Sequence, residues 1–193
     1  MIHIVTIGGS ARPGNYTAKA LALVQRELRN LDEVVVTEID PATLKLAIPG
    51  SAMDSSDRDW LIETVAAADG VILATPEYHG TFSSLMKLVI ENLGFPSALA
   101  EKPVVLLGVA SGRIGAIKSL EHLRSVCSHV GALVLPDPIS VARVSSVFDE
   151  QGNCLDPAMD TAIRGLAMNL VDYVRHTTCP CGALEVRVRA DTL

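Results

Sequence analysis

Five short runs of apolar residues recur along the chain, and segments with a different apolar spacing separate them. The runs are rich in valine, isoleucine and leucine, have few polar residues at alternate positions, and lie at 2–7, 34–39, 70–76, 102–110 and 131–136. A strand with one face in water alternates apolar and polar residues. Runs without that alternation therefore predict strands that are buried on both faces.

Between these runs, apolar side chains recur at steps of three and four, the spacing of one helix face. The residues that carry this pattern are Leu21, Val24, Leu28 and Leu31; Leu61, Val65 and Ala68; Ala116, Leu120, Leu123, Cys127 and Val130; and Met159, Ile163, Leu166 and Leu170. Five repeats of a strand and a helix predict an α/β fold with helices on both faces of a parallel sheet. We therefore expect a flavodoxin-like three-layer α/β/α sandwich with a five-stranded parallel sheet in the order 2-1-3-4-5.

The loops at one edge of such a sheet are the first place to look for a site. Ligands bind beyond the carboxyl ends of the strands, where the loops after the first, third and fourth strands meet. Here these loops read GGSARPGNYT at 8–17, TPEYHGTFSS at 75–84 and ASGRIG at 110–115. We expect the site to be built from these three loops.

The first loop has the composition of a phosphate site. Its two leading glycines permit a tight turn, and Ser10, Asn15 and Thr17 carry side chains that can hydrogen-bond to a phosphate. The following helix offers free backbone N–H groups and Arg12 adds a positive charge, so a phosphate monoester fits without a metal ion. The loop lacks the G-K-[ST] and G-x-G-x-x-G patterns of other nucleotide-binding loops. The alternative is a polar turn in which Thr17 caps the helix and Arg12 is solvated.

The second loop leaves a buried strand through Pro76, Glu77 and Tyr78, and a helix over 83–93 follows, capped by Ser83 or Ser84. A turn of this kind can present backbone N–H groups to a flat ligand, and a tyrosine adds a planar surface. The alternative is structural: the proline ends the strand, the tyrosine is half-buried, and His79 is an ordinary exposed loop residue.

Composition limits the class of protein. The chain has 193 residues, of which 49% are hydrophobic, enough for one core, and its formal net charge is −6. The acidic balance, without a run of like charge, argues against a nucleic acid or an anionic membrane as partner. The chain shows no signal-peptide pattern and no apolar stretch of membrane-spanning length, so we expect a cytoplasmic protein with reduced cysteines.

The segment TTCPCGALEVRVRADTL lies beyond the motif-bearing part of the chain. We expect one domain over 1–176 and a tail over 177–193, in which LEVRVR forms a short edge strand. Cys179 and Cys181 could bind a metal or cycle as thiols, but two ligands do not complete a zinc site. We therefore expect no metal centre.

Three motifs, GSARPGNYT, TPEYHG with LMKLVIENL, and ASGRIGAIKSLEHLR, occur in order on the three loops and the helices that follow. Over roughly residues 2–135 the chain resembles the NADPH-dependent FMN reductase family, flavodoxin-like enzymes that include quinone, azo-dye and chromate reductases. Ser10 and Arg12 match the family pattern, whereas Asn15 and Thr17 stand where serine and asparagine are usual. His79 replaces the asparagine of the family's Pro-Glu-Tyr-Asn-Gly turn.

The resemblance implies FMN as cofactor and NADPH or NADH as the hydride donor, with a quinone, azo dye, chromate or free flavin as acceptor. It implies phosphate binding at the 8–17 loop and a flavin ring between the 76–80 and 110–115 loops. The implied cofactor-binding residues are Ser10, Arg12, Asn15, Tyr16, Thr17, Pro76, Glu77, Tyr78, His79, Gly80, Ser111, Gly112 and Arg113. Since the flavin carries the chemistry, no catalytic side chain is assigned. The alternatives are a flavodoxin-type electron carrier and a flavin-bound sensor without turnover.

The helix predicted at 83–93 has more apolar surface than one sheet can cover. Its six apolar residues spread over roughly 200° of the helix circumference, about twice the minimum stripe; they are Leu85, Met86, Leu88, Val89, Ile90 and Leu93. We expect the excess to meet another subunit. Family members are commonly dimers or tetramers with flavin sites near subunit contacts, so we expect a homodimer or homotetramer.

Overall fold

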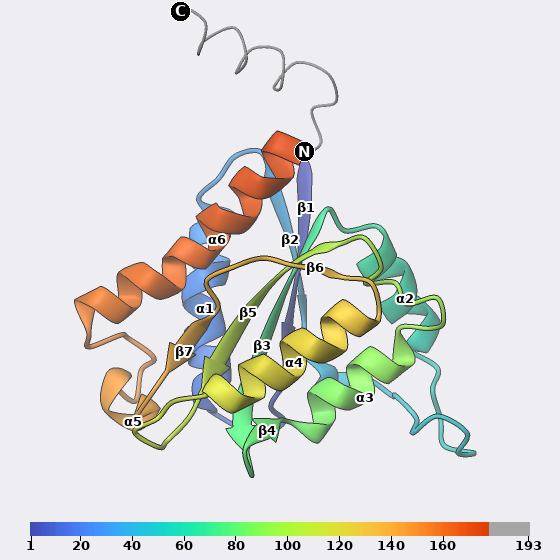
Figure 1. The fold of residues 1–193 in the computed structure, drawn as a ribbon, viewed down its shortest axis with the longest axis horizontal. Helices are drawn as coiled ribbons and strands as arrows, with labels where there is room; N and C mark the ends of the chain where they lie inside the picture. The colour runs from blue at the N-terminus through green and yellow to red at the C-terminus, as the bar shows by residue number, and fades with distance from the viewer. Residues whose placement is uncertain (178–193) are drawn as a thin grey trace, which may run out of the picture.

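A parallel sheet with helices on both faces forms the body of the computed structural model, which describes residues 1–177 (Figure 1). The four long strands are β1 (Ile2–Gly8), β2 (Val34–Ile39), β3 (Gly70–Tyr78) and β5 (Pro103–Val109). The short strands are β4 (Thr81–Phe82), β6 (Leu133–Val134) and β7 (Ile139–Val141). The order of the main sheet is β2-β1-β3-β5-β6, so the flavodoxin-like parallel arrangement is confirmed.

The number of strands differs from the expected five, because the described residues form a seven-stranded sheet. The predicted fifth strand at 131–136 yields only β6. After four intervening residues the chain pairs with the same edge of β5 again, as β7. Pro136 and Pro138 lie in the gap, with Asp137 between them at a φ of 59°. Proline has no N–H to donate to a neighbouring strand, which accounts for the break. The added β4 pairs antiparallel with the end of β3 and is too short for a hydrophobic pattern to predict.

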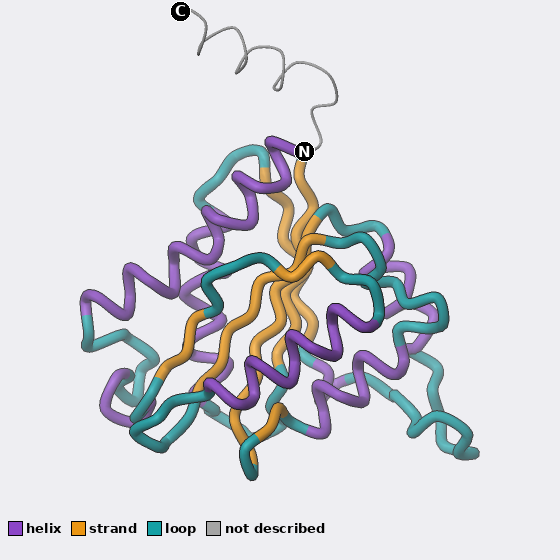
Figure 2. The backbone as a smooth tube through the Cα atoms, in the orientation of Figure 1, coloured by secondary structure: helices purple, strands orange, loops and turns teal. Residues whose placement is uncertain are grey.

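Two layers of helices cover the sheet, as Figures 1 and 2 show. One face carries α1 (Tyr16–Arg29) and α6 (Pro157–Thr177), and the other carries α2 (Arg58–Ala66), α3 (Ser84–Asn92) and α4 (Ile117–His129). Two short elements, η1 (Pro41–Thr43) and α5 (Val144–Val147), lie in connections. Each face has its own cluster of buried apolar side chains. The helix spacing read from the sequence therefore identified the buried faces.

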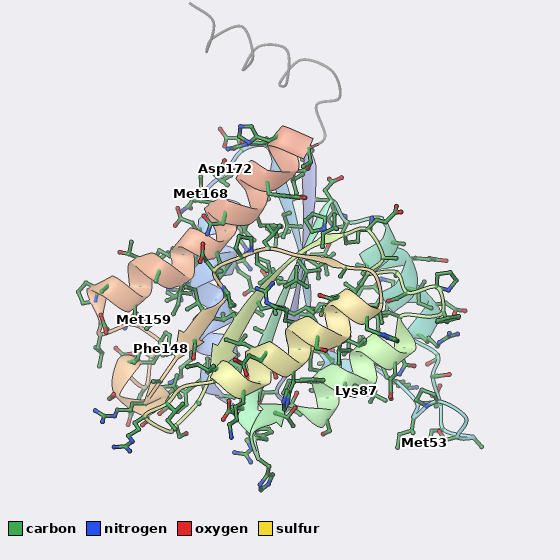
Figure 3. The ribbon with its side chains drawn as sticks, viewed as in Figure 1. Met53, Lys87, Phe148, Met159, Met168 and Asp172 are labelled. Carbon is green, nitrogen blue, oxygen red and sulfur yellow. The ribbon has the colours of Figure 1, made fainter. Side chains whose placement is uncertain are left out.

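Individual core residues behave as their positions predict. Burial raises the pKa of the Cys127 thiol to about 12, so this cysteine packs in α4 as a small protonated hydrophobe. Phe148, which follows α5, is buried in the cluster against which Met159 of α6 packs (Figure 3). Figure 3 also labels Met53, an exposed residue in the connection that precedes α2.

Some of the sequence predictions concern the end of the chain. Residues 178–193, with Cys179, Cys181 and the predicted edge strand, lie outside the described residues, and Thr177 ends α6. Within residues 1–177 no cluster of three His, Cys, Asp or Glu side chains could hold a metal ion. No helix in this range is long and apolar enough to cross a bilayer.

Candidate functional site

Two adjoining cavities lie at the carboxyl ends of β1, β3 and β5. The phosphate-loop cavity, about 280 Å³, is lined by residues 10 and 12–17, 76–78, 109–111 and 144. The outer cavity, about 570 Å³, is lined by residues 12, 77–78 and 110–115. The cavities share five lining residues: Arg12, Glu77, Tyr78, Ala110 and Ser111. The three loops read from the sequence therefore do meet at one place.

Most of the predicted site residues line these cavities. Those that do are Ser10, Arg12, Asn15, Tyr16, Thr17, Pro76, Glu77, Tyr78, Ser111, Gly112 and Arg113. His79 and Gly80 line neither cavity. They have positive φ values of 51° and 76° and form the two-residue turn between β3 and β4, with the His79 side chain exposed.

The start of the first loop is fixed by contacts to β3 and α3. The Gly9 N–H donates to the carbonyl of Ala74 at 2.7 Å, and the Ser83 hydroxyl donates to the carbonyl of Gly9 at 2.6 Å. A Cβ at position 9 would lie only 2.8 Å from the Ala74 oxygen. Glycine is therefore required at this close approach of two backbones. The Ser83 oxygen also accepts from the Met86 N–H, which confirms Ser83 as the N-cap of α3.

Asn15 closes the rest of the loop. Its side-chain amide donates to the carbonyl of Arg12 at 2.7 Å and lies 3.4 Å from that of Ser10, while its oxygen accepts from the Ala18 N–H at 2.8 Å. Asn15, and not Thr17, is thus the N-cap of α1, and Thr17 is buried in the first turn. The first turn of α1 contains no acidic residue, so its positive dipole end faces the cavity uncompensated.

Arg12 links the first loop to the turn after β3. Its guanidinium carbon lies 4.8 Å from the centroid of the Tyr78 ring, and the Ser10 hydroxyl lies 3.5 Å from the Tyr78 hydroxyl. The side chain is exposed, and within residues 1–177 no carboxylate forms an ion pair with it. Its positive charge therefore remains available to an anion in either cavity.

Glu77 has a structural partner. Its carboxylate accepts a hydrogen bond from the Ser119 N–H at 3.2 Å, in the first turn of α4. The N-cap residue of that helix, Ala116, has no capping side chain, so Glu77 satisfies an N–H that the helix itself leaves free. The contact fixes the turn after β3 to the start of α4.

The 110–116 loop is held by a segment that the sequence analysis did not include. Hydrogen bonds join the Ala110 N–H to the Val141 carbonyl at 2.9 Å, the Arg143 N–H to the Gly112 carbonyl at 3.0 Å, and the Ala116 N–H to the Ser140 hydroxyl at 2.8 Å. Val144 itself lines the phosphate-loop cavity. Applying the carboxyl-edge rule to the loop after the fifth strand would have indicated this segment.

The donor set fits a flavin mononucleotide. A loop with serine and threonine hydroxyls, an unpaired arginine and a helix start suits a phosphate, and the adjoining cavity has the size of an ordinary ligand site. Fold and site together define a flavodoxin-like protein whose first loop, at the carboxyl edge of the sheet, has the donors that a phosphate requires.

Comparisons with known proteins specify the family. The model of the NADPH-dependent FMN reductase family matches residues 2–145, and the chain belongs to this family. It is 28% identical over 185 residues to an NAD(P)H-dependent FMN reductase of Pseudomonas aeruginosa, covering 90% of this chain and 96% of that one. It is 33% identical over 109 residues to an NADPH azoreductase of a Bacillus species, covering 56% and 61% of the two chains.

A solved structure supports the fold. FerB of Paracoccus denitrificans, a flavoenzyme NAD(P)H:(acceptor) oxidoreductase, superposes with a TM-score of 0.76 at 18% identity, over 91% of this chain and 98% of that one. The family membership makes the protein an oxidoreductase, and it confirms the expected pairing of FMN with a reduced nicotinamide.

Proposed function

We propose that the protein transfers hydride from NADPH or NADH to FMN and then passes electrons to a small acceptor such as a quinone, an azo dye, chromate or free flavin. The observation that carries this proposal is the pair of adjoining cavities joined by Arg12 and Tyr78. One cavity has the features of a phosphate site, and the other leaves room for a flat ring and a second molecule. The names of the relatives support the acceptor class.

The chain's own residues would have separate tasks. Ser10, Arg12 and the N–H groups at the start of α1 would hold the phosphate, and Asn15 would keep the loop closed around it. The 76–78 and 110–113 segments would flank the flavin ring. The bound flavin would supply the redox chemistry: it would take a hydride from NADPH, which would become NADP⁺, and it would pass two electrons to the acceptor, with protons from solvent. No side chain needs to act as an acid or a base.

One experiment tests the function. The purified protein is loaded with FMN, its visible spectrum is recorded, NADPH is added without oxygen, and quinone, azo dye, chromate and free FMN are then offered in turn. We expect the flavin band to bleach with NADPH and to return with at least one acceptor, with parallel-line steady-state kinetics. Tight FMN binding without nicotinamide oxidation by any acceptor would favour the carrier or the sensor and would refute the proposal.

We further propose that the protein acts as a homodimer or homotetramer through α3, in the cytoplasm. Met86, Val89 and Ile90 of α3 are buried against the sheet, whereas Leu85 and Leu88 remain half-exposed. A second subunit that covered them would also lie near Ser83, which bonds to the first loop. Leu88→Glu should therefore lower both the mass seen by light scattering and the affinity for FMN. Asn169→Glu, on an exposed position of α6 across the sheet, is the control, and a fully active wild-type monomer would refute the assembly.

A further inference from the structure

Lys19, near the start of α1, binds a turn that lies 130 positions later in the chain. Its ammonium group donates hydrogen bonds to the carbonyls of Asp149 at 2.7 Å and Glu150 at 3.2 Å. These residues begin the 149–152 turn, in which the Gly152 N–H donates to the Asp149 carbonyl at 3.2 Å. A Cβ at Gly152 would lie 3.5 Å from the Lys19 Cγ, so the turn packs on the lysine stem as well. Lysine side chains usually extend their ammonium into water, whereas this half-buried one is held by its partners.

The same ammonium group contacts a residue of the phosphate-loop cavity. Its nitrogen lies 5.0 Å from the centroid of the Tyr16 ring, within the range of a cation–π contact, and Tyr16 lines that cavity. Lys19 itself lines neither of the two cavities. Within residues 1–177 no carboxylate forms an ion pair with it, and the Asp149 carboxylate accepts from the backbone N–H and the side-chain amide of Asn153 instead. The contacts of Lys19 are therefore with the tyrosine and the turn.

The turn belongs to a segment that supplies another part of the cavity wall. Val144, at the start of α5, lines the phosphate-loop cavity. The segment that runs from α5 through the turn is closed by a hydrogen bond from the Leu155 N–H to the Val147 carbonyl at 2.7 Å, and α5 lies at the carboxyl edge of the sheet in Figure 1. Lys19 thus connects two lining residues of one cavity, Tyr16 and Val144, that come from distant parts of the chain.

We propose that Lys19 is a positioning residue for FMN, which keeps Tyr16 and Val144 at the separation that the phosphate requires. The proposal rests on the proposed function, because it takes the phosphate-loop cavity as the site of the FMN phosphate. Without the ammonium group, the carbonyls of the 149–152 turn would bond to water, and the Tyr16 ring would lose the contact that fixes its orientation. The cavity wall would then have to become ordered when the flavin binds, which lowers the affinity.

The first test compares FMN with riboflavin, which has the same ring but no phosphate. Both are titrated into the full-length protein freed of flavin, followed by flavin fluorescence, for the wild type, Lys19→Met, Lys19→Arg and Arg26→Met. We expect the affinity advantage of FMN over riboflavin to fall about tenfold in Lys19→Met, because ordering of the cavity wall then opposes binding of the phosphate. Lys19→Arg keeps the charge and the N–H donors and should restore most of the advantage. Arg26→Met changes an exposed position of α1 outside both cavities and should leave it unchanged.

The outcomes distinguish this role of Lys19 from the phosphate site on which it depends. An unchanged FMN advantage in folded Lys19→Met protein would overturn the proposal, and the same result in Arg12→Ala would also refute the phosphate site in the first loop. An equal loss of affinity for both flavins would make Lys19 a residue of general stability and would overturn the proposal too. Because the titrations use no nicotinamide, a failure of NADPH to reduce the bound flavin would refute the proposed function alone.

The second test measures the loosening of the wall directly, by amide hydrogen exchange and mass spectrometry of the full-length protein without flavin. The Val144 N–H donates to the carbonyl of Ala110 at 3.1 Å, so its exchange reports on the segment that Lys19 holds. We expect peptides over 141–155 to exchange about tenfold faster in Lys19→Met and to exchange at the wild-type rate in Arg26→Met. A lower FMN advantage with unchanged exchange would show that the charge of Lys19 acts on the phosphate from a distance, and it would overturn the positioning role.

Discussion

The two loops that form the site are held in different ways. The 9–17 loop is closed largely by its own residues, since the Asn15 side chain contacts the carbonyls of Ser10 and Arg12 and caps the helix that follows. The 110–116 loop is held from outside, by hydrogen bonds to residues about thirty positions later in the chain. The contacts that close the first loop can be recognised from its local sequence, whereas the contacts that hold the second loop from outside cannot.

This difference in how the two loops are held suits them to separate tasks. The first combines a fixed backbone with a helix start and one cation, which is what a small anion requires. The second presents exposed side chains, Arg113 and Ile114, on a supported backbone, which suits a larger partner that binds and leaves. Substitutions in each loop test this distinction.

Gly115→Ala should have the largest effect. Gly115 has a φ of 80°, and an added Cβ would lie 2.5 Å from the Ser140 hydroxyl that holds the loop. We expect the free energy of unfolding to fall by about 2–4 kcal/mol, from backbone strain and steric conflict, as measured by urea denaturation. Gly112→Ala is the matched control, because a Cβ there meets nothing within 4 Å. If the two variants unfolded with the same free energy, the Ser140 support of the 110–116 loop would not contribute to the stability of the fold.

Arg12→Ala should have the next largest effect and should act on binding. It removes the unpaired cation of the first loop, and we expect FMN binding to weaken by about 1.5–3 kcal/mol, as for a lost charge-assisted hydrogen bond. Titration followed by flavin fluorescence measures this change, with Arg26→Ala as the control. Unchanged affinity in a folded Arg12→Ala protein would contradict a phosphate site in this loop.

Glu77→Gln should have the smallest effect. Glutamine keeps an oxygen that can accept from the Ser119 N–H but removes the negative charge at the start of α4. We expect the free energy of unfolding to fall by about 0.5–1 kcal/mol, from the lost interaction with the helix dipole. Calorimetric unfolding of the apoprotein measures it. Weaker FMN binding at unchanged stability would instead make Glu77 a direct flavin contact.

The sequence predicted the sheet, the covering helices and the first loop, because each has a local pattern. Runs of Val, Ile and Leu produce buried strands wherever they occur, and the first loop has its glycines, cation and cap within ten residues. The N-cap of α1 shows the limit of this approach. The sequence suggested Thr17 as the candidate cap, and the structure has Asn15 there, because both residue types can cap a helix and only the course of the backbone decides between them.

The contacts that support the second loop could not be predicted from local sequence patterns. The supporting bond to Gly112 comes from the Arg143 N–H, a group that every residue except proline has, so no side chain marks it in the sequence. The break between β6 and β7 is different, because Pro136 and Pro138 are visible in the sequence, and the predicted strand ended at position 136. The strand resumes beyond them and returns the chain to the site.

The hydrogen bonds of Asn15 have a consequence for the ageing of the protein. Asparagine amides slowly hydrolyse to carboxylates, and heat-adapted proteins use fewer of them. An aspartate at position 15 could still accept from the Ala18 N–H, but it would lose both amide contacts to the loop and add a negative charge where a phosphate is expected. Deamidation of this single side chain would therefore leave α1 capped and the fold intact while flavin retention declined during storage.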